Sequence, residues 1–586
     1  MLQIYLSTSI PFPKDNPKFT LKHLNSGSYV YYETGRKYNS AKRQTTPIRV
    51  TVAKLDANNA NMMHPNEKYV ELFGNDNVPQ NEFTSTRSTT LSVGAFIAIQ
   101  KVISDYKLDE ILARAITDER NRGIFIDFAA YEIIAGSNVA QHYDKYAYRH
   151  PSFVKEMRIY SDSTIGTVFQ EITRDERQIF LDEWNKDRDK SKLIFMSYDS
   201  TNRHSRAGEI REAEFGKPKD GNADIPIINQ GQAYDSENRV PLFYESYPGS
   251  INDVSMLQYL VEKARSYGYF LLCFILDRGY FSRQNLFFMD DNGFYFLIMA
   301  KGNIHFIRSL VEEAMGSFEV ERQFLIRKFM VQGRTLIRKI FPNDERDKLR
   351  YVHVYYDELR ASCERRNLEE SVLKWENALI KCIGKAVKKS ITGYEKYFDL
   401  HFDKEGKMLS FETKDDVIEE EKFWAGYFAI VSSLEMTAEE ALIRYKGRDR
   451  SEKAFLSDKS FTGNDCYQVD TQESKDTKEW IGFCAEIIRN KIYTDLLDAQ
   501  ETVNSHSDYM TVPAALGELE KYEISRQGNG KYHIDHPLTK NQRTIMKALH
   551  LSKDEVTEEA NKICDQINQL IAESKIVNVA ELEDAD

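Results

Sequence analysis

The chain has 586 residues, far above the size at which one hydrophobic core stops growing, so we expect several domains. Its composition, 41% hydrophobic and 29% charged with 33 tyrosines and 33 phenylalanines, excludes a mainly disordered chain, and its longest apolar runs are too short to cross a membrane. The six cysteines include no CxxC pair, which argues against zinc and suits a reducing cytoplasm, and the net charge of −12 argues mildly against a nucleic-acid partner. With no signal-peptide pattern at the N-terminus, we expect a cytoplasmic protein.

The first half of the chain changes from β-like to helical patterns. Strand-like pieces separated by polar turns predict a β-rich region over residues 1–90. From Leu91, apolar residues recur at three- and four-residue spacing, which predicts a helical module over residues 91–190. Four strands are then predicted by the runs LIFMSYD (193–199), VPLFYESYPG (240–249), FLLCFILD (270–277) and FYFLIMAK (294–301). Helical segments between these runs favour an α/β sheet over residues 191–301.

Residues 302–422 break this alternation and predict an insertion domain inside the α/β domain. They combine strand candidates, a charged helical stretch at 357–390 and a hairpin-like piece. The strand GYFAIVSS and a cationic helix over 438–460 then resume the pattern, so the second part of the α/β core is expected over residues 423–500. Residues 501–586 are expected to be helical with an acidic tail.

The charge is distributed unevenly along the chain. Residues 321–390 hold 17 Lys or Arg against 10 Asp or Glu, whereas residues 553–586 hold 3 against 10. A basic segment inside an acidic chain is a candidate surface for DNA, and a solvated helical face is the alternative for any single lysine in it.

Two predicted strands end in an aspartate. Asp199 closes the first run and Asp277 closes the third, where Gly279 permits a tight turn beside the acid. The ends of strands are where sites form in open α/β sheets, although an aspartate after a strand is often only a turn former or helix cap.

The stretch RYKGRDRSEKAFLSDK, residues 444–459, supplies a third acid, Glu452. On a helix, four of its residues share one face, namely Tyr445, Arg448, Glu452 and Lys459. A mixed charge run is usually a solvated face, but six cations stand here against three acids, so pairing within the run cannot satisfy them all. An anion from outside the protein would neutralise the remaining cations.

Phosphodiester cleavage is the chemistry that needs such a set. Carboxylates can hold two Mg²⁺ ions without Cys or His, one ion activating the attacking oxygen and the other stabilising the leaving oxygen. Arg448 and Lys459 would grip flanking phosphates, and Tyr445 would offer a hydroxyl to phosphate or a ring to a base.

These residues resemble the DDE transposases of bacterial insertion sequences, in the branch called insertion-sequence family four. That branch places its last acid in a signature of Tyr, two residues, Arg, three residues, Glu, six residues and Lys, which the four residues above fit without a gap. Its first two acids match Asp199 in YDST and Asp277 in DRGYFS, and the resemblance covers about residues 190–495. Ser250 stands in the proline-glycine turn where Asn is commoner.

The resemblance implies a ribonuclease H-like core interrupted by an insertion, with Asp199, Asp277 and Glu452 as catalytic and metal-binding residues. It implies two Mg²⁺ ions as cofactor, with Mn²⁺ as a substitute. Tyr445, Arg448, Lys459 and Arg278 are expected to contact DNA, and the helical module 91–190 is a candidate for binding DNA ends. The partners implied are terminal inverted repeats and target DNA, a dimer in the DNA complex, and the cytoplasm of a bacterium.

Three other functions remain open at this level. A nuclease could use the same core and metals without strand transfer, and a domesticated relative could bind DNA without catalysis. Glycoside hydrolysis could use two of the acids but leaves the cationic face unexplained.

Overall fold

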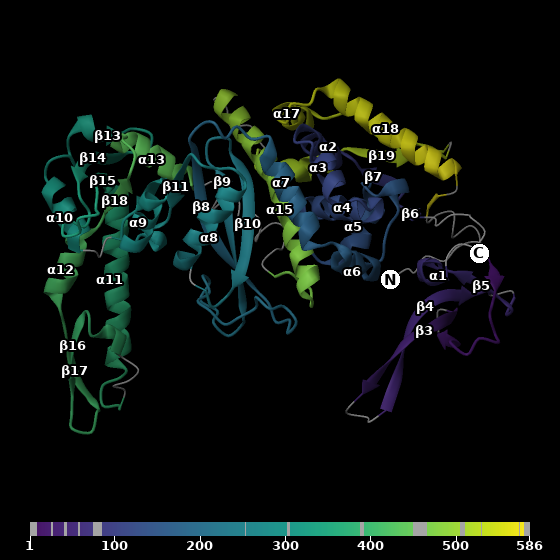
Figure 1. Ribbon diagram of the computed structural model, residues 1–586, viewed down its shortest axis with the longest axis horizontal. Coiled ribbons are helices and arrows are strands. Elements are labelled where there is room, and N and C mark those ends of the chain that lie inside the picture. Colours follow the sequence, from purple (N-terminus) through teal and green to yellow (C-terminus); the bar gives the residue numbers. More distant parts are fainter. Residues whose placement is uncertain are drawn as a thin grey trace. The chain divides into compact units, whose positions relative to one another are not determined.

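The computed structural model describes residues 9–24, 27–39, 44–56, 59–73, 85–251, 253–301, 305–386, 392–448, 466–503, 510–528, 530–573 and 575–578 (Figure 1). It is a mixed α/β protein that divides into two compact units. The first unit holds Met1–Lys186, Asn202–Ile228 and Ala454–Asp586, and the second holds Asp187–Thr201 and Asn229–Lys453. Within the described residues, no single helix is long and apolar enough to cross a membrane. Two helical segments, Glu119–Ala135 and Ala140–Arg149, reach the required length and apolar composition only when taken together, and they are bent by 80° relative to each other.

The first unit begins with a five-stranded sheet in the order β1-β5-β4-β3-β2. Its elements are β1 (Ile10–Pro11), β2 (Phe19–Leu24), β3 (Gly27–Asn39), β4 (Gln44–Leu55), β5 (Met62–Pro65) and the helix α1 (Glu67–Phe73). Apolar side chains from β1, β3, β4, β5 and α1 form its core, namely Ile10, Val30, Val52, Ala53, Met63 and Tyr69. This small core is separate from the helical part of the same unit.

Helices make up the rest of the first unit. They are α2 (Gly94–Asp105), α3 (Leu108–Ala115), α4 (Glu119–Ala135), α5 (Tyr143–Arg149), α6 (Asp162–Glu171), α7 (Arg174–Lys186), α15 (Gln472–Val503), α16 (Val512–Leu519), α17 (Lys540–Ala548) and α18 (Lys553–Ala572). The long helix α15 packs against α4 and α6, and its fully buried Trp480 has its ring 4.6 Å from that of Phe125.

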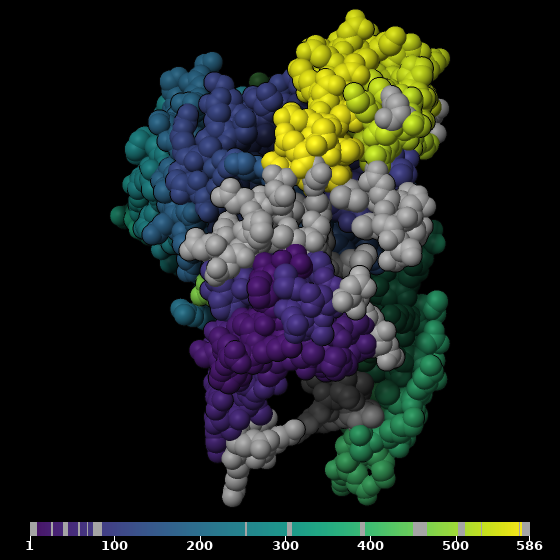
Figure 2. All heavy atoms as spheres, turned by 90° about the vertical axis from the view of Figure 1, so that its right-hand side faces the viewer, coloured from purple at the N-terminus to yellow at the C-terminus, as the bar shows by residue number. Residues whose placement is uncertain are grey.

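Short strands tie the two ends of the chain together in this unit. β6 (Ser85–Arg87) pairs in parallel with β21 (Ile576–Asn578), and β7 (Thr90–Ser92) pairs with β19 (Glu523–Arg526), which also pairs with β20 (Tyr532–Ile534). In Figure 2 the C-terminal helices form one continuous yellow surface.

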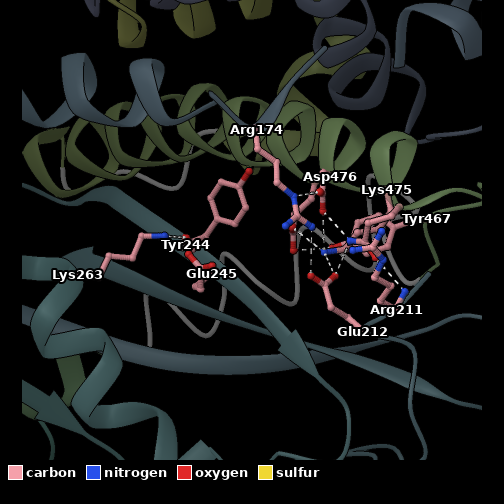
Figure 3. Close-up of polar contacts among 11 residues, drawn as sticks. Arg174, Arg211, Glu212, Tyr244, Glu245, Lys263, Tyr467, Lys475 and Asp476 are labelled. Atoms are coloured by element: carbon pink, nitrogen blue, oxygen red, sulfur yellow. Dashed lines mark hydrogen bonds and ion pairs between the residues drawn. The ribbon is translucent and has the colours of Figure 1, made fainter. Parts of the chain in front are cut away.

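A buried ion network holds α15 to the loop that contains Glu212 (Figure 3). Lys475, whose side chain is fully buried, has its Nζ atom 2.7 Å from Glu212, 3.0 Å from Glu479 and 3.5 Å from Asp476. Arg174 of α7 adds ion pairs to Asp476 and Glu212. Burial lowers the pKa of Lys475, but the three carboxylates outweigh it and raise that pKa above its usual value, so the lysine stays charged.

The second unit is built on a nine-stranded sheet in the order β10-β9-β8-β11-β12-β18-β15-β14-β13. Its strands are β8 (Ile194–His204), β9 (Ile227–Asp235), β10 (Val240–Pro248), β11 (Leu272–Leu276), β12 (Tyr295–Met299), β13 (Leu325–Ile326), β14 (Val331–Arg338), β15 (Arg350–Tyr356) and β18 (Tyr427–Ser432). β8, β11 and β12 are parallel, and β18 runs antiparallel to both β12 and β15. Its helices are α8 (Asp253–Ser266), α9 (Arg283–Asp291), α10 (His305–Ala314), α11 (Glu358–Ile380), α12 (Asp415–Trp424) and α13 (Ala438–Gly447).

The sheet changes the extent of the expected insertion. The prediction placed everything from 302 to 422 outside the core, whereas β13, β14 and β15 extend the main sheet beyond β18. The remaining part has its own small core, built from α11, α12 and the hairpin of β16 (Phe398–Phe402) and β17 (Met408–Thr413). The difference arises because β18, late in sequence, pairs with β15, and a pairing between distant segments leaves no local pattern.

His353 gives the second unit a pH-dependent stability. Its side chain is fully buried on β15, where Nδ1 lies 2.9 Å from Thr335 Oγ1, and burial lowers its pKa to about 4, a shift that Glu440 opposes. Between pH 6.5 and 4 the unfolded chain binds a proton that the folded chain does not, so stability falls as the pH falls.

Replacing His353 with glutamine is expected to remove about 3 kcal/mol of that acid-induced loss, because glutamine cannot titrate. Urea unfolding at several pH values in this window measures the difference. His401→Gln, at an exposed position of β16, is the control and should leave the pH profile unchanged. An unaltered profile in His353→Gln would contradict the assignment.

Candidate active site

Parallel pairing of β8 and β11 brings Asp199 and Asp277 to the same place. Tyr198 and Leu276 are register partners, so the two acids follow at equivalent positions on neighbouring strands, about 5 Å apart at Cα. Side chains alternate along a strand, and Asp199 and Asp277 therefore share a sheet face with Phe195 and with Cys273. Asp277 follows the end of β11, as expected, whereas Asp199 lies within β8 rather than at its edge.

The helix α13 covers this face of the sheet. It begins with a capping box, in which the Thr437 side chain accepts from the Glu440 backbone N–H and Glu440 accepts from that of Thr437. Its residues at three- and four-residue spacing pack on the sheet, namely Ala438, Ala441, Leu442 and Tyr445. The Tyr355 hydroxyl donates to the Ala438 carbonyl at 2.8 Å and thereby anchors the first turn to β15.

The last turn of α13 reaches both acids. The Tyr445 hydroxyl donates to Asp277 Oδ1 at 3.4 Å. Arg448, the C-cap residue, has Nη1 3.8 Å from Asp199 Oδ2 and Nη2 3.9 Å from Asp277 Oδ1. The structure thus joins four of the predicted site residues, two carboxylates, a hydroxyl and a guanidinium, in one cluster.

Burial separates the roles that these four side chains can play. The Asp277 side chain is 40% exposed and that of Asp199 is 18% exposed, so both carboxylates can meet a ligand from solution. Tyr445 is buried, and its hydroxyl is directed at Asp277. The expectation that Tyr445 contacts DNA stays a prediction, while its contact in this structure is with the acid.

Two tyrosines close to the acids in sequence pack against each other. Tyr198 and Tyr280, which neighbour the acids in sequence, meet edge to face with centroids 5.9 Å apart. A Cβ atom at Gly231 would lie 1.8 Å from the Tyr198 hydroxyl, so β9 requires glycine there. Neither tyrosine was singled out from the sequence, although each is within three residues of a predicted acid.

Arg444 stacks 3.7 Å above the Phe195 ring and pairs with Glu237 at 2.9 Å. One of the six cations of residues 444–459 therefore has a structural role in packing.

Arg278 takes part in a different feature. With Arg308 and Trp424 it lines a cavity of about 330 Å³ between α10, α11 and the start of β18, and Arg308 lies 5.2 Å from the Trp424 ring. Trp424, the last residue of α12, is half-buried and borders this cavity. A contact between Arg278 and DNA stays a prediction.

Glu452 and Lys459 lie outside the described residues. The predicted helix over 438–460 is described as α13 up to Gly447 with Arg448 as its cap, and the chain is described again from Cys466. Among the described residues, no group of three or more His, Cys, Asp or Glu side chains is arranged to hold a metal ion. The two aspartates alone form the described acidic part of the site.

Comparison with known proteins finds a known domain over the part of the chain that holds Asp199, Asp277 and Arg448. Residues 194–467 match the family model described as the transposase DDE domain, and no curated protein matches the chain. Among solved structures, the piggyBac transposase synaptic complex with hairpin DNA is 9% identical, with a TM-score of 0.33, over 86% of this chain and 80% of that one. The match gives this chain a transposase DDE domain over residues 194–467.

Proposed function

We propose that this enzyme is the transposase of a bacterial insertion sequence, acting in the cytoplasm. It binds the terminal inverted repeats of its element, cleaves DNA at the site of Asp199, Asp277 and Glu452, and joins the freed 3′ ends to target DNA as a dimer. The observation that carries the proposal is the placement of Asp199 and Asp277 on neighbouring parallel strands, both beside Arg448. The domain match over residues 194–467 includes all of these positions.

A ribonuclease H-like core is part of the proposal. The strand order β10-β9-β8-β11-β12 supports it. The strands β8, β9 and β10 are consecutive in sequence and lie beside the parallel pair β11 and β12. Asp199 lies on β8, and Asp277 directly follows the neighbouring strand β11. The helix α13 packs one side on the acid-bearing face, and the third predicted acid, Glu452, follows it in sequence.

The donor set suits magnesium. Asp199 and Asp277 offer carboxylate oxygens, the ligands that Mg²⁺ prefers, and Arg448 meets them at ion-pair distances of 3.8 and 3.9 Å rather than at close hydrogen-bond distance. We propose that these aspartates and Glu452 hold two Mg²⁺ ions, for which Mn²⁺ can substitute. When bound, such ions supply the charge that activates water and stabilises the leaving oxygen in phosphodiester cleavage.

The protein side chains prepare this site. Tyr445, held by the core under α13, donates to Asp277 and orients its carboxylate. Arg448 offsets the mutual repulsion of the two aspartates and presents a planar guanidinium suited to phosphate. In the proposal Lys459 adds a second cation for a flanking phosphate.

The test is strand transfer of a pre-cleaved DNA end. Duplexes that carry the sequences flanking the coding region, incubated with the full chain, Mg²⁺ and plasmid, are expected to give joined products. Cleavage without joining would replace the proposal with a metal-dependent nuclease. Binding without cleavage would replace it with a non-catalytic relative.

A further inference from the structure

The β3–β4 hairpin of the first unit concentrates positive charge. Residues 18–55, which hold β2, β3 and β4, carry eight Lys or Arg and one acid, Glu33, in a chain whose net charge is −12. Glu33 is itself paired with Arg36, at 2.6 Å. The described residues of β3 and β4 carry four of these cations, Arg36, Lys37, Arg49 and Lys54, against Glu33.

The outer half of this hairpin is a two-stranded ribbon. β2 pairs with β3 only as far as Tyr32, and β5 pairs with β4 only from Ala53 onward. Beyond those points, apart from the Glu33 N–H that donates to the Lys18 carbonyl, β3 and β4 pair with each other alone, from Glu33 opposite Arg49 to Asn39 opposite Gln44. This paired length is about 20 Å at 3.4 Å per residue, and Figure 1 shows it extending past the rest of its own sheet.

Both faces of the ribbon are exposed. Arg36, Lys37 and Arg49 are exposed, Tyr38 is 64% exposed and Ile48 is 47% exposed. Cross-strand partners share a face, so Lys37 with Thr46 lies on one face and Tyr38 with Thr45 lies on the other. Each face therefore combines a hydroxyl with a charged or aromatic neighbour, and no apolar core stabilises this half of the hairpin among the described residues.

We infer that the outer β3–β4 ribbon is a DNA-binding element that enters the major groove of a duplex. That groove, about 12 Å wide, admits a two-stranded ribbon with strands about 5 Å apart. Arg36, Lys37 and Arg49 then reach phosphates on the groove walls. A second copy of this chain is a poorer occupant, because two such cationic ribbons repel each other.

The inference rests on the proposed function for the choice of DNA, and it differs from the expectation that the helical module 91–190 binds DNA ends. It moves one DNA contact to the β-rich N-terminal sheet. The register shift between Glu33 and Gly35 fits this role, since a bulge increases the local twist of a ribbon.

The test is the salt dependence of binding, measured with the full chain and a fluorescent mixed-sequence duplex. Each lost phosphate contact lowers the slope of log affinity against log salt by about 0.9, so Arg36→Gln/Lys37→Gln/Arg49→Gln should reduce it by about 2 to 3 and weaken binding more than 10-fold near 0.1 M salt. The control is Lys540→Gln/Arg543→Gln/Lys547→Gln, which removes three exposed cations of α17, and it should keep the parental slope. Thermal unfolding verifies that both variants fold.

The outcomes separate this inference from the proposed function. If the parent binds and joins DNA and the ribbon variant keeps its slope, the inference alone fails. Equal losses in the α17 variant also overturn it, since net charge would then explain the effect. A ribbon variant with parental DNA affinity but altered mass by light scattering would make the ribbon a contact between copies. If the parent binds no duplex, both proposals fail.

Discussion

Asp277→Asn is expected to abolish DNA cleavage and joining by the full chain, with a loss of at least roughly 10³-fold in rate. Asparagine keeps the size of the side chain and can still accept the hydrogen bond from Tyr445, but it removes the negative charge that a hard cation requires. Asp199→Asn should have a comparable effect, because both acids face Arg448. Gel assays of strand cleavage with Mg²⁺ measure both.

A milder variant and a control variant accompany the two aspartate substitutions. Tyr445→Phe removes one hydrogen bond and keeps the packed ring, so its loss should be only about 10-fold. Asp291→Asn, at an exposed carboxylate at the end of α9, should retain full activity. Near-normal cleavage by Asp277→Asn would show that the cluster around Arg448 is not the catalytic site.

Lys475→Met is expected to destabilise the first unit by about 3 to 5 kcal/mol. The methionine fills much of the volume, but it leaves the carboxylates of Glu212, Glu479 and Asp476 without the cation at their centre. Arg174 remains beside two of them and limits the loss. Urea unfolding followed by tryptophan fluorescence measures the change, because Trp480 is buried on the same helix.

Lys491→Met provides the matched control on α15. Lys491 pairs with Asp495 four residues later at 2.5 Å, and its side chain is 22% exposed. Lys491 is partly exposed and Asp495 keeps a second neighbour, His550 Nε2 at 3.6 Å, so this variant should lose only about 1 kcal/mol. Equal destabilisation by both substitutions would contradict a special role for the buried network.

The strands that carry the acids were predictable because they are short apolar runs. LIFMSYD and FLLCFILD correspond to β8 and β11, and YFAIVS corresponds to β18. β9 was not predicted, since IINQGQAYD is rich in polar residues although all nine are buried. Hydrophobic periodicity detects burial by apolar side chains and misses a strand whose polar groups are buried.

The sequence by itself determined the spacing of Tyr445 and Arg448 and the position of each aspartate after an apolar run. A helix converts that spacing into a shared face, and the contacts of both residues with Asp277 follow from it. The tertiary structure alone decided that Asp199 and Asp277 are neighbours, because strand pairing joins segments far apart in the chain. It also placed β13, β14 and β15 in the main sheet and buried Tyr445 between α13 and the sheet, since long-range pairing and packing, unlike helical spacing, are not encoded in any local pattern.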